Sequence, residues 1–144
     1  MNTVERDIEI DAPVEKIWQV LTDAAFISLW DDVPGSFTDS KLSLGSKLVW
    51  DLEDGHQSSI TVTIFEPESE LKTTLYVTRW PSPPSAYDIA YHYLIINRQN
   101  KTVLKIMVGD FEALGDKAPN YVEASEEFLQ TAGDKIRELA EARA

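Results

Sequence analysis

The amino-acid sequence predicts an α+β domain in which an antiparallel β-sheet packs against a long C-terminal helix. In the middle of the chain, segments with alternating apolar residues follow one another between turn signals, a pattern typical of successive β-hairpins. The last segment instead repeats its apolar residues at helical spacing. Because a sheet with one apolar face needs a cover, we expect this amphipathic helix to lie on it. Periodicity alone leaves other α+β topologies open.

Length and composition fit one domain over residues 1–144. A chain of 144 residues buries roughly two-thirds or more of its unfolded surface, which is enough for a sizeable core. Hydrophobic residues at 43% and charged residues at 26% are ordinary for a soluble globular protein. The sequence has no cysteine, which excludes a disulfide, a thiolate nucleophile and a cysteine-ligated metal.

The first expected elements are a short strand and two helices. Ile8 and Ile10 alternate with acidic residues, as in a half-buried strand. Pro13 follows, where the first turn of a helix has no use for its N–H. A second short helix is expected from Ala24 to Trp30, ending at two aspartates. The apolar stripe of the first helix consists of Val14, Ile17, Trp18 and Leu21.

The central segment predicts successive strands joined by tight turns. Asp54-Gly55 is a hairpin signal, because this pair is favoured where φ must be positive, and residues 97–100 are a second turn. The proline-rich segment 81–85 cannot pair as a central strand. Residues 37–44 are ambiguous between a strand and a loop. The expected strands cover residues 47–52, 60–64, 71–80, 87–96 and 102–108.

The final element is expected to be the longest helix, from about Asn120 to Glu141. Asn120 with Glu123 three residues later resembles a capping box, which would start the helix there. Phe128, Ala132 and Ile136 share one stripe at helical spacing, so we expect them to face the sheet.

The opening of the chain resembles the START-like superfamily, also called SRPBCC, helix-grip or Bet v 1-like. The family opens with a strand, an Ala-Pro step, and a helix that carries Val/Ile-Trp and ends in Leu-Thr-Asp. The matching residues are Ile10, Ala12-Pro13, Ile17-Trp18 and Leu21-Thr22-Asp23. Within the superfamily, the chain looks most like the branch related to the Hsp90 ATPase activator. The resemblance covers essentially the whole chain and implies the helix-grip fold, in which a curved antiparallel sheet wraps the C-terminal helix.

This resemblance implies a cavity between the sheet and the C-terminal helix. Such cavities are mostly apolar with a few placed polar groups. Each aromatic residue at a periodic position can equally be core filler, as we expect for Trp18. The candidate ligand-binding aromatic residues are Trp30, Phe37, Trp50, Tyr76, Trp80, Tyr121 and Phe128.

His92 is the polar candidate of the same site. With Asp88 it shares one face of the strand at 87–96, while Tyr91 and Tyr93 share the other. If the face of His92 is internal, both polar groups need partners and can contact a ligand. The alternative is a histidine on the solvated face of the sheet.

Signatures of catalysis are absent from the sequence. It contains no nucleophile elbow, zinc-protease helix, phosphate-binding glycine loop or EF-hand spacing. Two separated histidines without cysteine make a poor metal site, and the pair Asp31-Asp32 is explained by the end of a helix. We therefore expect no catalytic residues, no metal and no cofactor, although an acid–base enzyme using His92 with Asp88 stays open.

The formal net charge of −12 bears on partners. Phosphate backbones and anionic lipid surfaces are repelled at long range, so we expect no nucleic acid and no membrane partner. A monomer or a weak homodimer in the cytoplasm is the simplest expectation. For function, we expect binding of a small hydrophobic or aromatic molecule in the cavity. The alternatives are a protein-interaction module of the Hsp90-activator type and a cyclase- or hydrolase-like enzyme using the same cavity.

Overall fold

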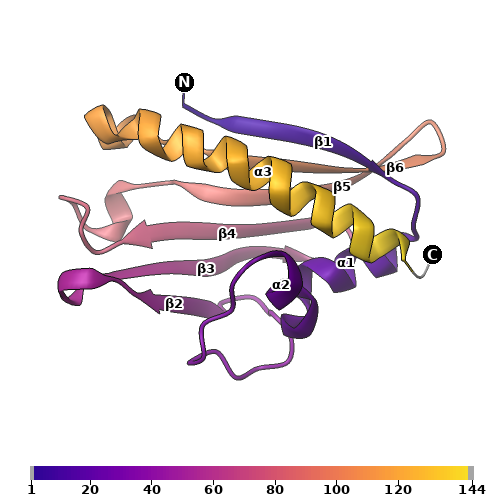
Figure 1. The fold of residues 1–144 in the computed structure, drawn as a ribbon, viewed down its shortest axis with the longest axis horizontal. Helices are drawn as coiled ribbons and strands as arrows, with labels where there is room; N and C mark the ends of the chain where they lie inside the picture. The colour runs from indigo at the N-terminus through magenta and orange to yellow at the C-terminus, as the bar shows by residue number, and fades with distance from the viewer. Residues whose placement is uncertain (1, 143–144) are drawn as a thin grey trace.

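The computed structural model describes residues 2–142, which form one antiparallel sheet and helices that cover its concave face (Figure 1). The strands lie in the order β1-β6-β5-β4-β3-β2, and every neighbouring pair is antiparallel. The elements are β1 (Val4–Ile10), α1 (Val14–Thr22), α2 (Ala24–Trp30), β2 (Lys47–Asp51), η1 (Glu53–Gly55), β3 (Gln57–Glu66), β4 (Glu70–Val77), η2 (Pro84–Ala86), β5 (Ala90–Arg98), β6 (Lys101–Gly109), η3 (Glu112–Lys117) and α3 (Ala118–Glu141). This arrangement confirms the expected α+β helix-grip fold.

The concave face of the sheet is a continuous apolar surface because the strand registers bring inward positions together. Ile8 in β1 pairs with Leu104 in β6, and Ile106 in β6 pairs with Tyr93 in β5. Tyr93 pairs in turn with Leu71 in β4. These side chains are all buried. Residues one position along each strand point to the convex face, as the two-residue period of a strand requires.

Helix α3 runs across the concave face and packs closest to β1 (Figure 1). Ala132 and Ile136 are buried there as expected, while Phe128 is half-buried. Gly133 permits the close approach, since a Cβ at this position would lie 2.7 Å from Ile8 Cδ1. None of the helices in the described part of the chain has the length and apolar character needed to cross a bilayer.

The start of α3 differs from the expected one. The helix begins at Ala118, its N-cap residue is Lys117, and no side chain caps it. Asn120 therefore lies inside the helix, and the expected capping box with Glu123 is wrong. Pro119 explains the earlier start, because its φ angle suits a first helical turn and its missing N–H is not needed there.

The hairpin turns follow the sequence signals closely, whereas two strands are shorter than expected. Asp54 and Gly55 both have positive φ, at 61° and 76°. Trp80 lies beyond the end of β4 and Tyr87 before the start of β5, because the prolines between them cannot donate ladder hydrogen bonds. The ambiguous segment 37–44 is a loop, apart from an isolated bridge between Lys41 and Asp23.

Candidate functional site

A cavity of about 190 Å³ lies on the concave face of the sheet, beside the C-terminal end of α2. Strands β2 to β5 form its floor, and the two residues after α2 stand at its edge. A small void of about 20 Å³ shares part of this lining and extends toward Trp30, Leu21 and Ile27 in the core. The lining of the main cavity consists of Asp31, Asp32, Trp50, Ser58, Ile60, Thr73, Leu75, Tyr91 and Tyr93.

Aromatic rings of β2 and β5 line this space, and one ring each from α2 and α3 packs against the tyrosines. Trp30 of α2 meets Tyr93 edge-on with a centroid distance of 6.2 Å, and Phe128 of α3 meets Tyr91 at 5.3 Å. Such edge-to-face pairs are favoured by the quadrupoles of the rings. Trp30 is held in place because its indole N–H donates to the Val20 carbonyl oxygen at 2.8 Å. The rings therefore form a wall whose shape is set before any ligand arrives.

Two buried hydroxyl groups in the cavity lack a protein partner. Thr73 and Tyr93 are only 3% and 4% exposed, yet neither hydroxyl makes a hydrogen bond to the described residues. Every side-chain nitrogen or oxygen atom that is sealed inside residues 2–142 does have a hydrogen-bond partner. The two hydroxyls are thus not sealed but open into the cavity that their residues line. They are available to hydrogen-bond a bound molecule or water.

Asp31 and Asp32 place two carboxyl groups at the open end of the cavity, where both residues keep contact with solvent. Asp32 Oδ2 accepts a hydrogen bond from the Trp50 indole N–H at 3.0 Å. No ion pair within the described part of the chain includes either aspartate. The negative charges of Asp31 and Asp32 at the cavity are consequently not neutralised by an ion pair with a lysine or arginine of the described residues.

The surroundings shift the protonation of three groups at this site. Desolvation raises the pKa of Asp31; repulsion from Asp32 adds to the shift, and a hydrogen bond from the Asp32 backbone opposes it. Desolvation, followed by the charge of Asp31, raises the pKa of Tyr91 to about 12 and that of Tyr93 well above its ordinary value. Both tyrosines therefore stay neutral hydrogen-bonding groups at physiological pH, while Asp31 ionises less readily than an ordinary aspartate.

Replacing Asp31 with asparagine is expected to stabilise the folded protein at pH 7. Because the pKa of Asp31 is higher in the folded than in the unfolded state, its contribution to stability is fully present below the unfolded-state pKa and is lost as pH rises through the folded-state pKa. At pH 7 the ionised carboxylate therefore disfavours the folded state. The gain in melting temperature should therefore shrink as pH falls through the folded-state pKa and disappear below about 3.9, where the carboxyl is protonated in both states. Asp134→Asn is the matched control and should lower the melting temperature at pH 7, because a hydrogen bond from Arg6 lowers the pKa of Asp134 in the folded state. Equal shifts at pH 7 and pH 4.5 would contradict this account.

The structure divides the aromatic residues expected at the site. Trp50 lines the main cavity, Trp30 lines its inner extension, and Phe128 packs on the rings of Trp30 and Tyr91. Tyr76, Trp80 and Tyr121 instead form a separate cluster in which Trp80 contacts both tyrosines edge-on. The Trp80 N–H donates to the Tyr121 hydroxyl at 3.0 Å, and the Tyr76 hydroxyl donates to the Ser82 carbonyl oxygen at 2.7 Å. Their polar atoms are thus engaged within the protein, and this second cluster lies apart from the lining of the main cavity.

Phe37 and His92 lie away from the cavity lining. Phe37 is half-buried in the loop between α2 and β2 and packs on the core. His92 points to the convex face, where its Nε2 lies 2.5 Å from Glu70 Oε2. Asp88 is exposed and pairs with Lys72 at 3.3 Å, so the hypothesis of a His92–Asp88 acid–base pair inside the cavity is wrong. Residues 2–142 contain no group of three or more metal-ligating side chains.

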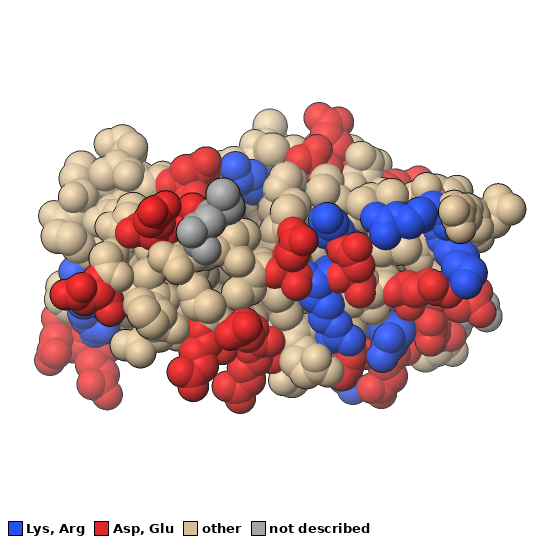
Figure 2. Space-filling view, turned by 90° about the horizontal axis from the view of Figure 1, so that it is seen from above, with Lys and Arg blue, Asp and Glu red and all other residues tan. Residues whose placement is uncertain are grey.

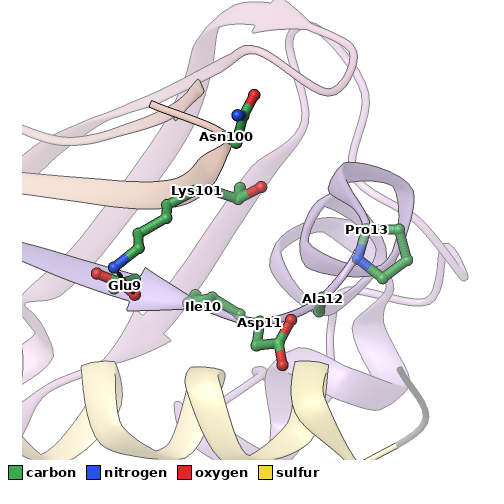
Figure 3. Close-up of a pocket in the computed structure, with 8 residues that line it drawn as sticks. Glu9, Ile10, Asp11, Ala12, Pro13, Asn100 and Lys101 are labelled. Atoms are coloured by element: carbon green, nitrogen blue, oxygen red, sulfur yellow. Dashed lines mark ion pairs between the residues drawn. The ribbon is translucent and has the colours of Figure 1, made fainter. Parts of the chain in front are cut away.

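A larger hollow of about 540 Å³ lies on the outer surface, between the end of β1 and the β5–β6 turn (Figure 3). Its lining is mostly polar and has no aromatic side chain. Lys101 reaches across it to pair with Glu9 at 3.4 Å, as the dashed line in Figure 3 shows. A groove that is bridged by its own exposed ion pair and has no aromatic wall suits an aromatic ligand less well than the inner cavity does.

Basic side chains on the face drawn in Figure 2 lie among acidic ones. Arg98 and Lys105 both contact Asp7, at 3.5 Å and 3.9 Å, and Lys101 contacts Glu9. The lysines and arginines of the β5–β6 hairpin are thereby partly neutralised by β1. These ion pairs leave mixed charge along β1 and the β5–β6 hairpin rather than the continuous basic surface that a polyanion would require.

Of the residues that line the main cavity, only Trp50 was a candidate from the sequence. The lining residues that sequence reasoning missed are Asp31, Asp32, Ser58, Ile60, Thr73, Leu75, Tyr91 and Tyr93. A signal for the tyrosines was present, since Tyr91 and Tyr93 share the strand face opposite His92. Deciding which face is internal required the pairing of Tyr93 with buried Ile106. The aspartates carried no signal beyond a helix end, because their position depends on how the loop after α2 crosses the sheet.

Comparisons with known proteins agree with this architecture. The family model described as Activator of Hsp90 ATPase homolog 1-like protein matches residues 11–141, whereas no curated protein matches the chain. A crystal structure of a Mesorhizobium loti protein is similar with a TM-score of 0.71 and 20% identity, covering 95% of each chain. A crystal structure of a Chromobacterium violaceum protein is similar with a TM-score of 0.68 and 17% identity, covering 98% of this chain and 99% of that protein. The solution structure of the Aha1 dimer from Colwellia psychrerythraea is similar with a TM-score of 0.63 and 18% identity, covering 95% of this chain and 97% of that chain. Because the family model spans nearly the whole chain, the protein belongs to the Activator of Hsp90 ATPase homolog 1-like family.

Proposed function

We propose that the protein binds a small molecule with an aromatic or apolar body in the cavity on the concave face of the sheet, beside the C-terminal end of α2. The observation that carries this proposal is a preformed space lined by aromatic rings, into which two buried hydroxyl groups open without a protein partner. Ligand sites commonly combine apolar walls with a few polar groups that set orientation. A packed core would instead close the space and satisfy each hydroxyl internally.

The volume of the cavity limits the size of its ligand. An apolar cavity of about 150 Å³ in another protein is large enough for benzene, and the cavity here is about 190 Å³. One ring with a short substituent therefore fits, whereas drug-sized ligands occupy about 300 Å³ or more. The open end at Asp31 and Asp32 provides the entry.

Filling the cavity tests this function. Thr73→Leu adds apolar volume on the floor of the cavity and should weaken the binding of benzyl alcohol about tenfold or more, because ligand and side chain compete for one space. Thr74→Leu is the matched control on the same strand, since Thr74 points to the convex face and contacts Thr63 there. Binding is measured by isothermal calorimetry and by quenching of tryptophan fluorescence, which Trp50 should report. Absence of saturable binding to the unmodified protein, or equal weakening in both variants, would contradict the proposal.

A second candidate is the protein-interaction role that the family description names. Leu29 on α2 and Leu44 in the following loop are exposed apolar side chains that a protein partner could cover. A discriminating measurement is the ATPase rate of Hsp90 with and without the protein. An unchanged rate excludes the activator role, and an increased rate that persists in Thr73→Leu separates it from cavity binding. Self-association is expected to be weak, since the net charge of −12 opposes it.

A further inference from the structure

The charged groups at the cavity are all of one sign, although its walls are aromatic. Asp31 and Asp32 stand at the open end, and no lysine or arginine within the described part of the chain forms an ion pair with either. The indole of Trp50 is hydrogen-bonded to Asp32 at 3.0 Å, which fixes an aromatic ring directly beside a carboxylate. A positive charge placed there would meet both a carboxylate and an electron-rich ring.

The interior of the same cavity supplies a second, independent observation. The hydroxyls of Thr73 and Tyr93 are almost completely buried, make no hydrogen bond to the described residues and open into the cavity. Hydroxyl oxygens accept hydrogen bonds from N–H donors. A protonated amine carries several N–H donors. The hydroxyl oxygens, the two carboxylates and the aromatic rings of the cavity therefore all favour the same ligand, an ammonium group.

We propose that the preferred ligand of this cavity is a small organic cation, namely a protonated amine attached to one aromatic or aliphatic body. The proposal rests on the binding function proposed above and adds the charge of the ligand. The cationic end would lie among Asp31, Asp32 and the hydroxyls of Thr73 and Tyr93. The apolar body would pack against Tyr91, Leu75 and Ile60. The strongly acidic protein would also raise the local concentration of cations and favour their encounter.

A metal ion fits these residues less well than an organic cation. A calcium ion takes six to eight oxygen ligands, whereas this lining supplies two carboxylates and otherwise only neutral side-chain hydroxyls. Trp50 and the tyrosines are instead the side chains that attract ammonium groups through their ring faces, an interaction worth about 0.5–2 kcal/mol.

Three probes that share a phenyl ring and differ in charge test the proposal: benzylammonium, benzyl alcohol and benzoate. At pH 7 and 0.15 M salt, calorimetry should show benzylammonium binding about tenfold more tightly than benzyl alcohol, and benzoate most weakly. The double variant Asp31→Asn with Asp32→Asn should bring the first two affinities within about twofold, because it removes both carboxylates and keeps their hydrogen-bonding shape. Asp116→Asn, an exposed aspartate in η3, is the control for general charge and should leave the preference intact.

The outcomes separate this inference from the function on which it rests. Equal affinity for benzylammonium and benzyl alcohol would overturn the preference for cations and leave cavity binding standing. If the double variant still prefers benzylammonium over benzyl alcohol, the preference comes from the overall charge of the protein, and the inference is also overturned. If none of the three probes binds, both proposals fall. A melting curve of the double variant verifies that it is folded, and Asp31→Asn alone should already reduce the preference.

Discussion

Replacing Ile136 with alanine should lower the free energy of unfolding by about 2–5 kcal/mol. Ile136 is 0% exposed and lies on the stripe of α3 that faces the sheet. Truncating its side chain removes buried apolar atoms and leaves a cavity that the surrounding strands cannot fully close. In a domain of this size, the melting temperature should fall by about 3 °C for each kcal/mol lost.

The control for this truncation is Leu29→Ala on α2. Leu29 is 55% exposed, so shortening it should change stability by less than about 0.5 kcal/mol. Chemical unfolding followed by circular dichroism measures both variants. If Ile136→Ala and Leu29→Ala lower the free energy of unfolding by comparable amounts, α3 does not pack on the sheet through the stripe containing Ile136.

Arg6→Met should destabilise the fold by about 2 kcal/mol, since hydrogen bonds to charged groups contribute about 1.5–3 kcal/mol. Arg6 joins β1 to the middle of α3. Its Nη1 donates to the carbonyl oxygens of Leu129 and Gln130 at 2.9 Å and 3.0 Å, and its Nη2 pairs with Asp134 at 2.6 Å. Methionine preserves much of the apolar stem but none of these donors. Arg79→Met, which removes an exposed arginine that forms no ion pair among the described residues, should have little effect.

The contact between Arg6 and Asp134 also predicts a difference in acid stability. The hydrogen bond from Arg6 is the largest cause that holds the pKa of Asp134 below its ordinary value. A depressed pKa stabilises the fold above the unfolded pKa, and this stabilisation is lost as pH falls through the folded pKa. The stability gap between the unmodified protein and Arg6→Met should therefore narrow at acidic pH. A gap that is constant from pH 7 to pH 3 would show that the charge of Asp134 does not contribute.

Much of the fold follows from local patterns. The alternation around Ile8 and Ile10 identifies a half-buried strand, and the stripe containing Ala132 and Ile136 identifies the helix that covers the sheet. Asp54-Gly55 predicts its hairpin because positive φ angles are a property of the turn itself. Each of these features depends on residues a few positions apart, so the sequence alone contains the necessary information.

Local patterns could not locate the candidate site completely. Trp30, Trp50 and Phe128 were expected at the cavity, and they lie in or beside it. Tyr76 was expected with them but belongs to a second cluster with Trp80. Aromatic spacing along a chain predicts burial, whereas membership of one cluster or the other depends on contacts between distant elements.

The sequence by itself determined the order of the elements, the successive antiparallel hairpins and the apolar stripe of the covering helix, because periodicity and turn chemistry are local properties. The pairing of β1 with β6, which joins Val4 to Val108, is not local and completes the sheet only in the tertiary structure. The tertiary structure decided which face of β5 is internal, bringing Tyr93 into the cavity and turning His92 toward Glu70 on the convex face. It also carried Asp32 next to Trp50, 18 positions away in the chain. The physical reason is that tyrosine and histidine both tolerate either side of a sheet, so only packing against Ile106 and α3, and the path of the loop after α2, select the final arrangement.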